Sequence, residues 1–287
     1  MSAWTGGQYS AYRVLFGLYL CVHFAQLVPY GAELFSNAGV LPDGSASPLL
    51  HAFPNVFALV DSPAFVTGTL VAGAVLALLL ALGIGDRWAA ALLWYLWACL
   101  FGRNPLIANP GLPYVGLLLV VHALLPRAPY GSLAARLRKD GAELAREWRM
   151  DHRLWRVVWI LMAVGYSYSG YTKLVSPSWM DGTAMARVLE NPLARTGGLN
   201  ELMLSLPEGV MAALTWGALA AELLFAPLAL ARRLRPWLWA AMLAMHLGLI
   251  TLIDFADLSL GMVMLHLFTF DPGWLPGLSG RAGKPSA

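Results

Sequence analysis

Charged side chains are scarce in this sequence of 287 residues. Asp, Glu, Lys and Arg together make up 12% of it, whereas 59% of the residues are hydrophobic. A soluble globular domain carries roughly 25% charged residues. With half that share, the chain cannot cover a water-exposed surface, which excludes a large soluble catalytic domain and a nucleic-acid reader. The mean hydropathy of +0.62 agrees with this reading.

Cysteine is nearly absent. The two cysteines, Cys21 and Cys99, lie in apolar stretches and form no Cys-x-x-Cys pair, which excludes a disulfide scaffold and a cysteine redox centre. The six histidines show neither His-x-x-His nor His-Glu-x-x-His spacing. The sequence therefore predicts no metal site on a helix.

Long apolar runs are abundant. A helix that crosses a bilayer needs about 20 apolar residues, and the sequence contains about eight such candidate stretches. We therefore expect an all-α, polytopic integral membrane bundle over residues 1–272, followed by a polar, disordered cytoplasmic tail at 273–287. The predicted spans are 10–28, 64–84, 88–101, 114–125, 154–172, 209–231, 236–253 and 258–270.

Lysine and arginine set the predicted orientation, because cytoplasmic loops are enriched in both. Basic residues occur at Arg87, eight times within 127–156, and at three positions within 232–235, whereas the loop after the first span has none. We therefore expect a multi-pass protein of the cell membrane, in a bacterium the inner membrane, with both termini cytoplasmic. The loops expected on the extracytoplasmic face are 31–61, 103–113 and 173–208.

Ionisable residues inside apolar spans are costly in lipid and mark candidate functional sites. Glu222 lies near the middle of the sixth span and His246 near the middle of the seventh, so we expect the two side chains to meet. Such a pair either handles protons or a ligand, or only holds two helices together. Arg13 lies near the cytoplasmic end of the first span, where a long side chain either reaches the interface or lines a pocket.

The end of the fifth span carries the most informative polar pattern. Four residues recur there at helical spacing (i, i+3, i+4 and i+7): Tyr166, Ser169, Gly170 and Lys173. They share one helical face, which must meet protein, water or a ligand inside an apolar helix. Burial disfavours the charged ammonium of Lys173, and the neutral amine is a base. The alternative is a lysine that reaches out to the interface, close to Trp179.

The segment 170–182 reads Gly-Tyr-Thr-Lys-Leu-Val-Ser-Pro-Ser-Trp-Met-Asp-Gly. It resembles the Gly-x-x-Lys-Leu…Trp-x-x-Gly motif of the vitamin K-dependent gamma-carboxylase and of the wider horizontally transferred transmembrane (HTTM) domain family. The resemblance covers nearly the whole chain. Arg13 and Gly17 are similar to the Arg-x-x-x-Gly of the family's first helix. The loop at 37–42, Glu222 and His246 match further positions of the family.

The resemblance implies a reaction on the extracytoplasmic side, with Lys173 as the catalytic base. In the carboxylase, the corresponding lysine deprotonates a reduced quinone, and oxygen then converts the quinol to a strong base. That base removes a proton from a glutamate of a peptide or protein substrate, to which carbon dioxide adds. The implied cofactor is vitamin K or menaquinone hydroquinone, without a metal. The residues expected to line its pocket are Tyr166, Ser169, Trp179, Glu222, His246 and Arg13.

Two features depart from the carboxylase. No histidine lies between His51 and His122, where the carboxylase has one that assists its base. The large lumenal domain that binds the substrate propeptide has no counterpart in this sequence. Two other functions therefore stay open. One is a non-catalytic accessory, maturation or immunity protein that keeps the helical scaffold. The other is a small-solute transporter, which the lack of internal repeats disfavours.

Overall fold

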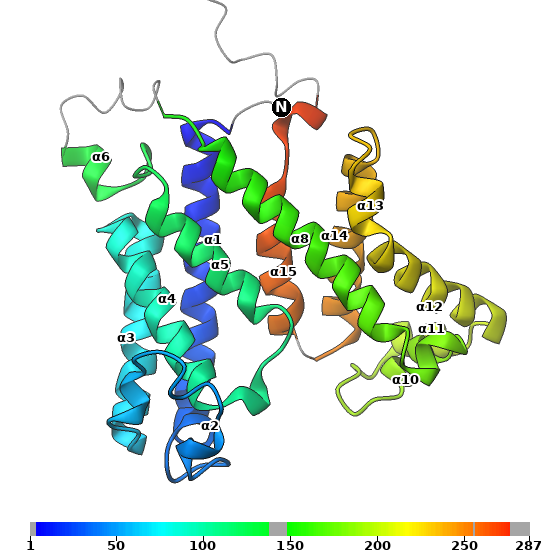
Figure 1. Cartoon of the computed structure of the whole chain (residues 1–287), viewed down its shortest axis with the longest axis horizontal. Coiled ribbons are helices and arrows are strands. Elements are labelled where there is room, and N and C mark those ends of the chain that lie inside the picture. The colour runs from blue at the N-terminus through cyan, green and yellow to red at the C-terminus, as the bar shows by residue number, and fades with distance from the viewer. Residues whose placement is uncertain (1–3, 138–147, 255, 276–287) are drawn as a thin grey trace, which may run out of the picture. The chain divides into compact units, whose positions relative to one another are not determined.

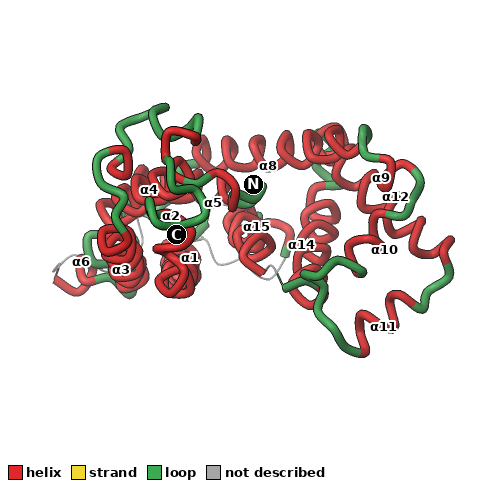
Figure 2. Tube along the Cα trace, turned by 90° about the horizontal axis from the view of Figure 1, so that it is seen from below, coloured by secondary structure: helices red, strands yellow, loops and turns green. Residues whose placement is uncertain are grey.

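The structure is a computed structural model that describes residues 4–137, 148–254 and 256–275. Within these ranges the regular structure is helical and no strand is drawn (Figures 1 and 2). The expectation of an all-α chain is confirmed. Most of the predicted tail, residues 276–287, lies outside the described residues.

The chain divides into two compact units, and each is described by itself. The first comprises Met1–His152 and Asp271–Ala287, and the second Arg153–Phe270. The helices that begin within the first unit's range are α1 (Gly6–Leu27), α2 (Gly31–Phe35), α3 (Pro63–Leu82), α4 (Asp86–Arg103), α5 (Leu112–Leu124), α6 (Leu133–Leu137) and, at its last residue, α8 (His152–Lys173). Those that follow in the second unit are α9 (Pro177–Met180), α10 (Ala184–Leu189), α11 (Gly198–Leu204), α12 (Glu208–Leu223), α13 (Phe225–Ala229), α14 (Arg235–Leu252) and α15 (Ala256–Thr269).

Each predicted span coincides with helical structure, and the helix ends differ from the predicted ends by a few residues. Two helices are long and apolar enough to cross a membrane: α3, and α1 continued through α2 to Phe35. A third candidate is α11 with α12, which are bent by 101° relative to each other. The remaining described helices do not meet the same criteria of length and hydropathy.

The sixth predicted span, 209–231, is interrupted rather than continuous. α12 ends at Leu223 and α13 begins at Phe225. Pro227 explains the break, because its ring has no N–H for the carbonyl of Leu223 and would clash with that carbonyl in a helix. The nearby N–H of Ala226 donates instead to Ser167 Oγ on α8 at 2.9 Å.

In the first unit, α1 packs along α3, and α4 packs against both α3 and α5 (Figures 1 and 2). α1 approaches α3 closely at Gly17, where a Cβ atom would overlap the backbone of Ala81. Small residues permit such contacts between helix backbones.

Two loops of the first unit are bonded to each other at one end of these helices. Arg103, the last residue of α4, pairs with Asp61 at 3.0 Å. Asn104 Nδ2 donates to the carbonyl oxygen of Leu34 at 2.6 Å. The loops at 31–61 and 103–113, which the charge distribution predicts on one face of the membrane, therefore lie together.

In the second unit, α14 and α15 pack side by side (Figures 1 and 2). Trp239 Nε1 on α14 donates to the carbonyl oxygen of His266 on α15 at 2.8 Å. α8 approaches α12 closely at Gly170, where a Cβ atom would overlap the backbone of Leu223. This approach positions the polar residues of the second unit.

Candidate functional site

Lys173, the last residue of α8, forms an ion pair with Glu222 on α12. The Glu222 side chain is 7% exposed and the Lys173 side chain 22%. The close approach at Gly170 explains the pairing, because Gly170 lies one turn before Lys173 and its contact Leu223 directly follows Glu222. The Gly-x-x-Lys spacing thus brings an ammonium to a carboxylate on another helix.

Two further side chains contact the ammonium of Lys173. Its Nζ donates to Ser169 Oγ, one turn earlier on α8, at 3.2 Å. The ring of Trp179, on the short helix α9, has its centroid 4.7 Å from the same Nζ. A cation over an aromatic ring is attracted by the ring quadrupole. Lys173 therefore contacts three residues that the sequence assigned to its pocket.

A second polar cluster joins α8, α14 and α15. The phenol oxygen of Tyr166 lies 2.9 Å from Nε2 of His246 and 3.4 Å from Nε2 of His266. All three residues are buried, with exposed fractions of 5%, 6% and 0%. Three polar side chains from three helices therefore converge in the interior of the second unit.

Phe225, the first residue of α13, contacts the second cluster. Its ring packs on Tyr166 with centroids 5.0 Å apart, and it lies three residues after Glu222 in the sequence, beyond the break that ends α12. On α8, Tyr166 and Lys173 share one face, two helical turns apart. The Lys173–Glu222 pair and the Tyr166 cluster therefore lie along the same face of α8, and together they form the candidate site.

Partner choice in this site differs from the expectation. The sequence predicted that Glu222 and His246 would meet. In the structure, Glu222 accepts a hydrogen bond from Lys173, and His246 is hydrogen-bonded to Tyr166. From the sequence, His266 was interpreted as a structural residue on an apolar helix, whereas the structure places it in this polar cluster. The available signal was an ionisable residue within the last apolar span, near its C-terminal end.

Arg13 belongs to the first unit, where its side chain is fully buried. Nη1 donates to the carbonyl oxygen of Leu80 at 3.2 Å, and Nη2 to that of Gly131 at 3.0 Å. The guanidinium therefore does not reach the interface. It ties the end of α3 to the segment that follows α5, and both partners are backbone atoms.

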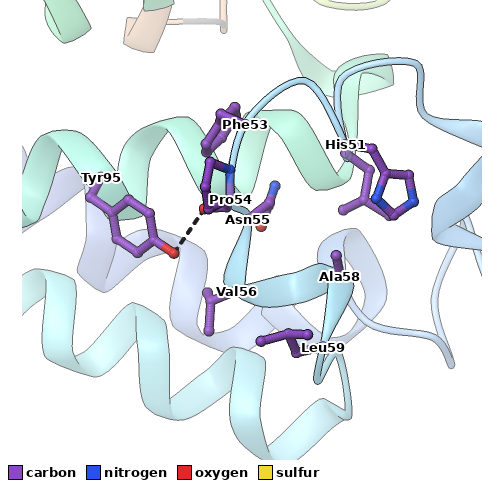
Figure 3. A pocket seen from close by; sticks show the side chains of 9 residues that line it. His51, Phe53, Pro54, Asn55, Val56, Ala58, Leu59 and Tyr95 are labelled. Carbon is purple, nitrogen blue, oxygen red and sulfur yellow. Dashed lines mark hydrogen bonds between the residues drawn. The ribbon is translucent and has the colours of Figure 1, made fainter.

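The first unit also contains a pocket of about 520 Å³, which the sequence did not predict (Figure 3). Leu59, Val56 and other apolar side chains form most of its wall. Tyr95 donates to the carbonyl oxygen of Pro54 at 3.0 Å. His51 and Asn55 also contribute polar side chains to the lining, so the wall combines an apolar surface with an imidazole, an amide and a phenol (Figure 3).

No family model, no curated protein and no solved structure matches the chain. Within the described ranges, no group of three His, Cys, Asp or Glu side chains is placed to hold a metal ion. What the site offers is proton chemistry. A lysine paired with a buried carboxylate, and a phenol between two imidazoles, all have protons to exchange.

Proposed function

We propose that the chain is an integral membrane protein of the HTTM, gamma-carboxylase-like family that uses Lys173 as a base on a reduced quinone at the extracytoplasmic side. The observation that carries this proposal is the Lys173–Glu222 pair, which is largely buried and contacted by Ser169 and Trp179. A lysine must lose a proton before it acts as a base, and Glu222 is a group that can take it.

Lys173 and Glu222 exist as an ion pair or as a neutral amine and carboxylic acid. Removing two charges from water is costly, so exclusion of water by an apolar ligand favours the neutral pair. The amine of Lys173 then accepts a proton from a ligand hydroxyl. Ser169 Oγ holds Nζ against α8 and keeps it aimed during this exchange.

The residues of the site fit a quinol. Its hydroxyl groups need polar partners, which Lys173 and the buried Nδ1 of His246 can provide. Its aromatic ring needs apolar surroundings, for which Trp179 and Phe225 are suited. When bound, a reduced quinone supplies reducing power: with oxygen it yields the epoxide and water, and drives removal of a proton from a carbon acid.

The same proposal includes the membrane topology. We infer that all the predicted spans cross the bilayer, that both termini are cytoplasmic, and that a peptide or protein substrate approaches from the extracytoplasmic side. Support comes from the coincidence of helices with predicted spans, and from the bonds between the loops at 31–61 and 103–113.

Quinol turnover tests the proposal. The purified chain in nanodiscs receives menaquinol or vitamin K hydroquinone under air, and the epoxide is quantified by chromatography. We expect epoxide from the natural chain and from the control Lys139→Ala, and none from Lys173→Ala. Absence of epoxide from well-folded natural protein would overturn the proposed chemistry.

One observation favours a second candidate, a non-catalytic accessory, maturation or immunity protein. Lys173 and Glu222 satisfy each other, as a purely structural pair between α8 and α12 would. In that case a partner protein binds on the extracytoplasmic face. Crosslinking from residues of the 173–208 loop would then recover one partner, and the recovery would not change in Lys173→Met/Glu222→Leu protein.

A further inference from the structure

His246 Nδ1 is a buried nitrogen with no hydrogen-bond partner among the described residues. A buried polar atom without a partner is costly and calls for an explanation. The Nδ1 atoms of two other buried histidines have partners. His122 and His266 both place Nδ1 2.8 Å from the carbonyl oxygen four residues earlier in their own helices. His246 makes no such bond to its own helix.

The bond made by His266 determines its tautomer. A carbonyl oxygen only accepts, so the Nδ1 of His266 carries the hydrogen that it donates to Met262. Neutral His266 therefore has its lone pair on Nε2, the atom that faces the phenol of Tyr166. His266 Nε2 is an acceptor.

The single hydrogen of the Tyr166 phenol goes to one of two histidines. If it goes to His246, then His266 Nε2 receives no hydrogen from the phenol, and His246 Nδ1 is a buried donor without an acceptor. If it goes to His266, the Nε2–H of His246 donates to the phenol oxygen, and both short contacts are satisfied. The second arrangement leaves fewer unsatisfied groups and is the favoured one.

We propose that His246 Nδ1 is the hydrogen-bond acceptor for a hydroxyl group of the ligand of this site. In the favoured arrangement, His246 Nε2–H donates to Tyr166 Oη, and the Tyr166 hydroxyl donates to His266 Nε2. The lone pair of the His246 ring then lies on Nδ1, so this nitrogen is an acceptor. Tyr166 and His266 are positioning residues, because they act through His246. The inference rests on the proposed function for the ligand, whose second hydroxyl would be bound here while Lys173 takes the proton of the first.

Nitrogen NMR of histidine-labelled protein tests the tautomer directly. We expect His246 to show an unprotonated Nδ1 and a protonated Nε2, and His266 to show the reverse. Resonances are assigned with His246→Gln and His266→Gln. A protonated Nδ1 in His246 overturns the proposal without any assay of activity.

Ligand binding is tested with menadiol without oxygen and with 1,4-dimethoxynaphthalene, which has the same ring system without hydroxyl hydrogens. We expect menadiol, but not the ether, to shift the Nδ1 resonance of His246. His246→Gln keeps an amide near the position of Nε2 and should bind menadiol about three- to tenfold more weakly. His246→Asn keeps an amide near the position of Nδ1 and should retain more of the affinity.

The outcomes separate this inference from the proposed function. Equal menadiol affinity in natural and His246→Gln protein overturns the inference and leaves the function standing. A third compound, 2-naphthol, has one hydroxyl group and is not a quinol. If menadiol does not bind but 2-naphthol shifts the Nδ1 resonance of His246, the proposed quinol function fails and the hydroxyl site stands. If neither compound moves the Nδ1 resonance, the nitrogen is satisfied by water and the inference is wrong.

Discussion

The fully buried arginines of the first unit and the lysine at the second unit's candidate site have different kinds of hydrogen-bond partner. In the first unit, Arg13 donates to backbone carbonyls and Arg103 to backbone carbonyls and Asp61. In the second, the hydrogen bonds that Lys173 makes within the described part of the chain go to the side chains of Glu222 and Ser169. A guanidinium stays protonated in proteins, whereas an ammonium can lose its proton to a carboxylate. The buried arginines of the first unit therefore tie loops together, whereas the lysine of the second unit has a partner to which, in the proposed function, it can lose its proton.

The largest expected effect comes from breaking the first unit's ion pair. Arg103 is fully buried and also donates to the carbonyl oxygen of Leu41 at 2.8 Å. Arg103→Met therefore leaves this carbonyl oxygen and the carboxylate of Asp61 without their hydrogen-bond donor. We expect a loss of about 3–5 kcal/mol in the free energy of unfolding. Denaturation in mixed micelles, followed by tryptophan fluorescence, measures it.

Asp61→Asn is the matched control for that pair. Asp61 is 23% exposed, so its neutral replacement keeps a hydrogen-bond acceptor and should cost less than Arg103→Met. Equal losses in the two variants would contradict the view that the buried arginine, rather than the carboxylate, organises the loops.

Substitutions at the Lys173–Glu222 pair of the second unit should affect stability and activity differently. Lys173→Met leaves the buried Glu222 carboxylate unpaired and should cost about 3 kcal/mol. Lys173→Met/Glu222→Leu removes both charges and should recover most of that loss, since well-packed apolar residues often replace buried ion pairs without cost. Unfolding in mixed micelles and epoxide formation are measured on the same samples.

Epoxide formation should be absent from both of those variants, although the double variant is stable. Activity in the double variant would show that the pair only holds α8 to α12. Recovery of stability without activity would separate the two roles of Lys173.

Two glycines test whether helix approach serves different purposes in the two units. Gly17→Ala and Gly170→Ala each force a methyl group against backbone, at Ala81 and Leu223. Each should cost about 1–3 kcal/mol of stability. Epoxide formation per folded molecule should fall for Gly170→Ala, because α8 moves away from Glu222, and should not change for Gly17→Ala.

Gly217→Ala on α12 is the control for these substitutions. No atom lies within 4 Å of the position that its Cβ would take, so the added methyl group meets open space. Alanine has the higher helix propensity, and the variant should be as stable as the natural chain or slightly more stable. A loss as large as that of Gly170→Ala would mean that backbone overlap is not the cause.

Helix positions were predictable because long apolar runs and their boundaries are local properties of a sequence. The sequence did not predict which helices are long enough to cross a membrane. The apolar helices α5 and α15 are shorter than α1 and α3, although their apolar runs were all interpreted as spans. The break between α12 and α13 follows from Pro227, a residue visible in the sequence. The division into two units depends on packing between distant segments, which no local pattern reports.

The site was predictable in part for the same reason. Helical spacing placed Tyr166, Ser169 and Lys173 on one face of α8. The choice of Glu222 as the partner of Lys173 depends on the register in which α8 meets α12, and spacing within a helix does not contain this register. His266 was missed because a histidine alone in an apolar run has the same local pattern whether it is structural or functional.

The smallest expected effect concerns one aspartate turn in each unit. The Thr183 hydroxyl, which donates to Asp181 at 2.7 Å, and the Thr183 N–H hold the pKa of Asp181 below its usual value of about 3.9. Ser45 lowers the pKa of Asp43 in the same way. An aspartate whose pKa is lower in the folded than in the unfolded protein adds stability at pH values above its unfolded-state pKa. This stability is lost as the pH falls through its folded-state pKa.

Thr183→Val removes the hydroxyl donor and keeps the N–H, so the pKa of Asp181 should rise toward its usual value. Ser45→Ala should raise the pKa of Asp43 likewise, and both are measured by carbon NMR of the carboxyl groups below about pH 5. Neither substitution should change epoxide formation at neutral pH, where both aspartates are ionised. A change confined to Thr183→Val would show that the proposed reaction depends on the 173–208 loop and not on the Ser45 turn of the 31–61 loop.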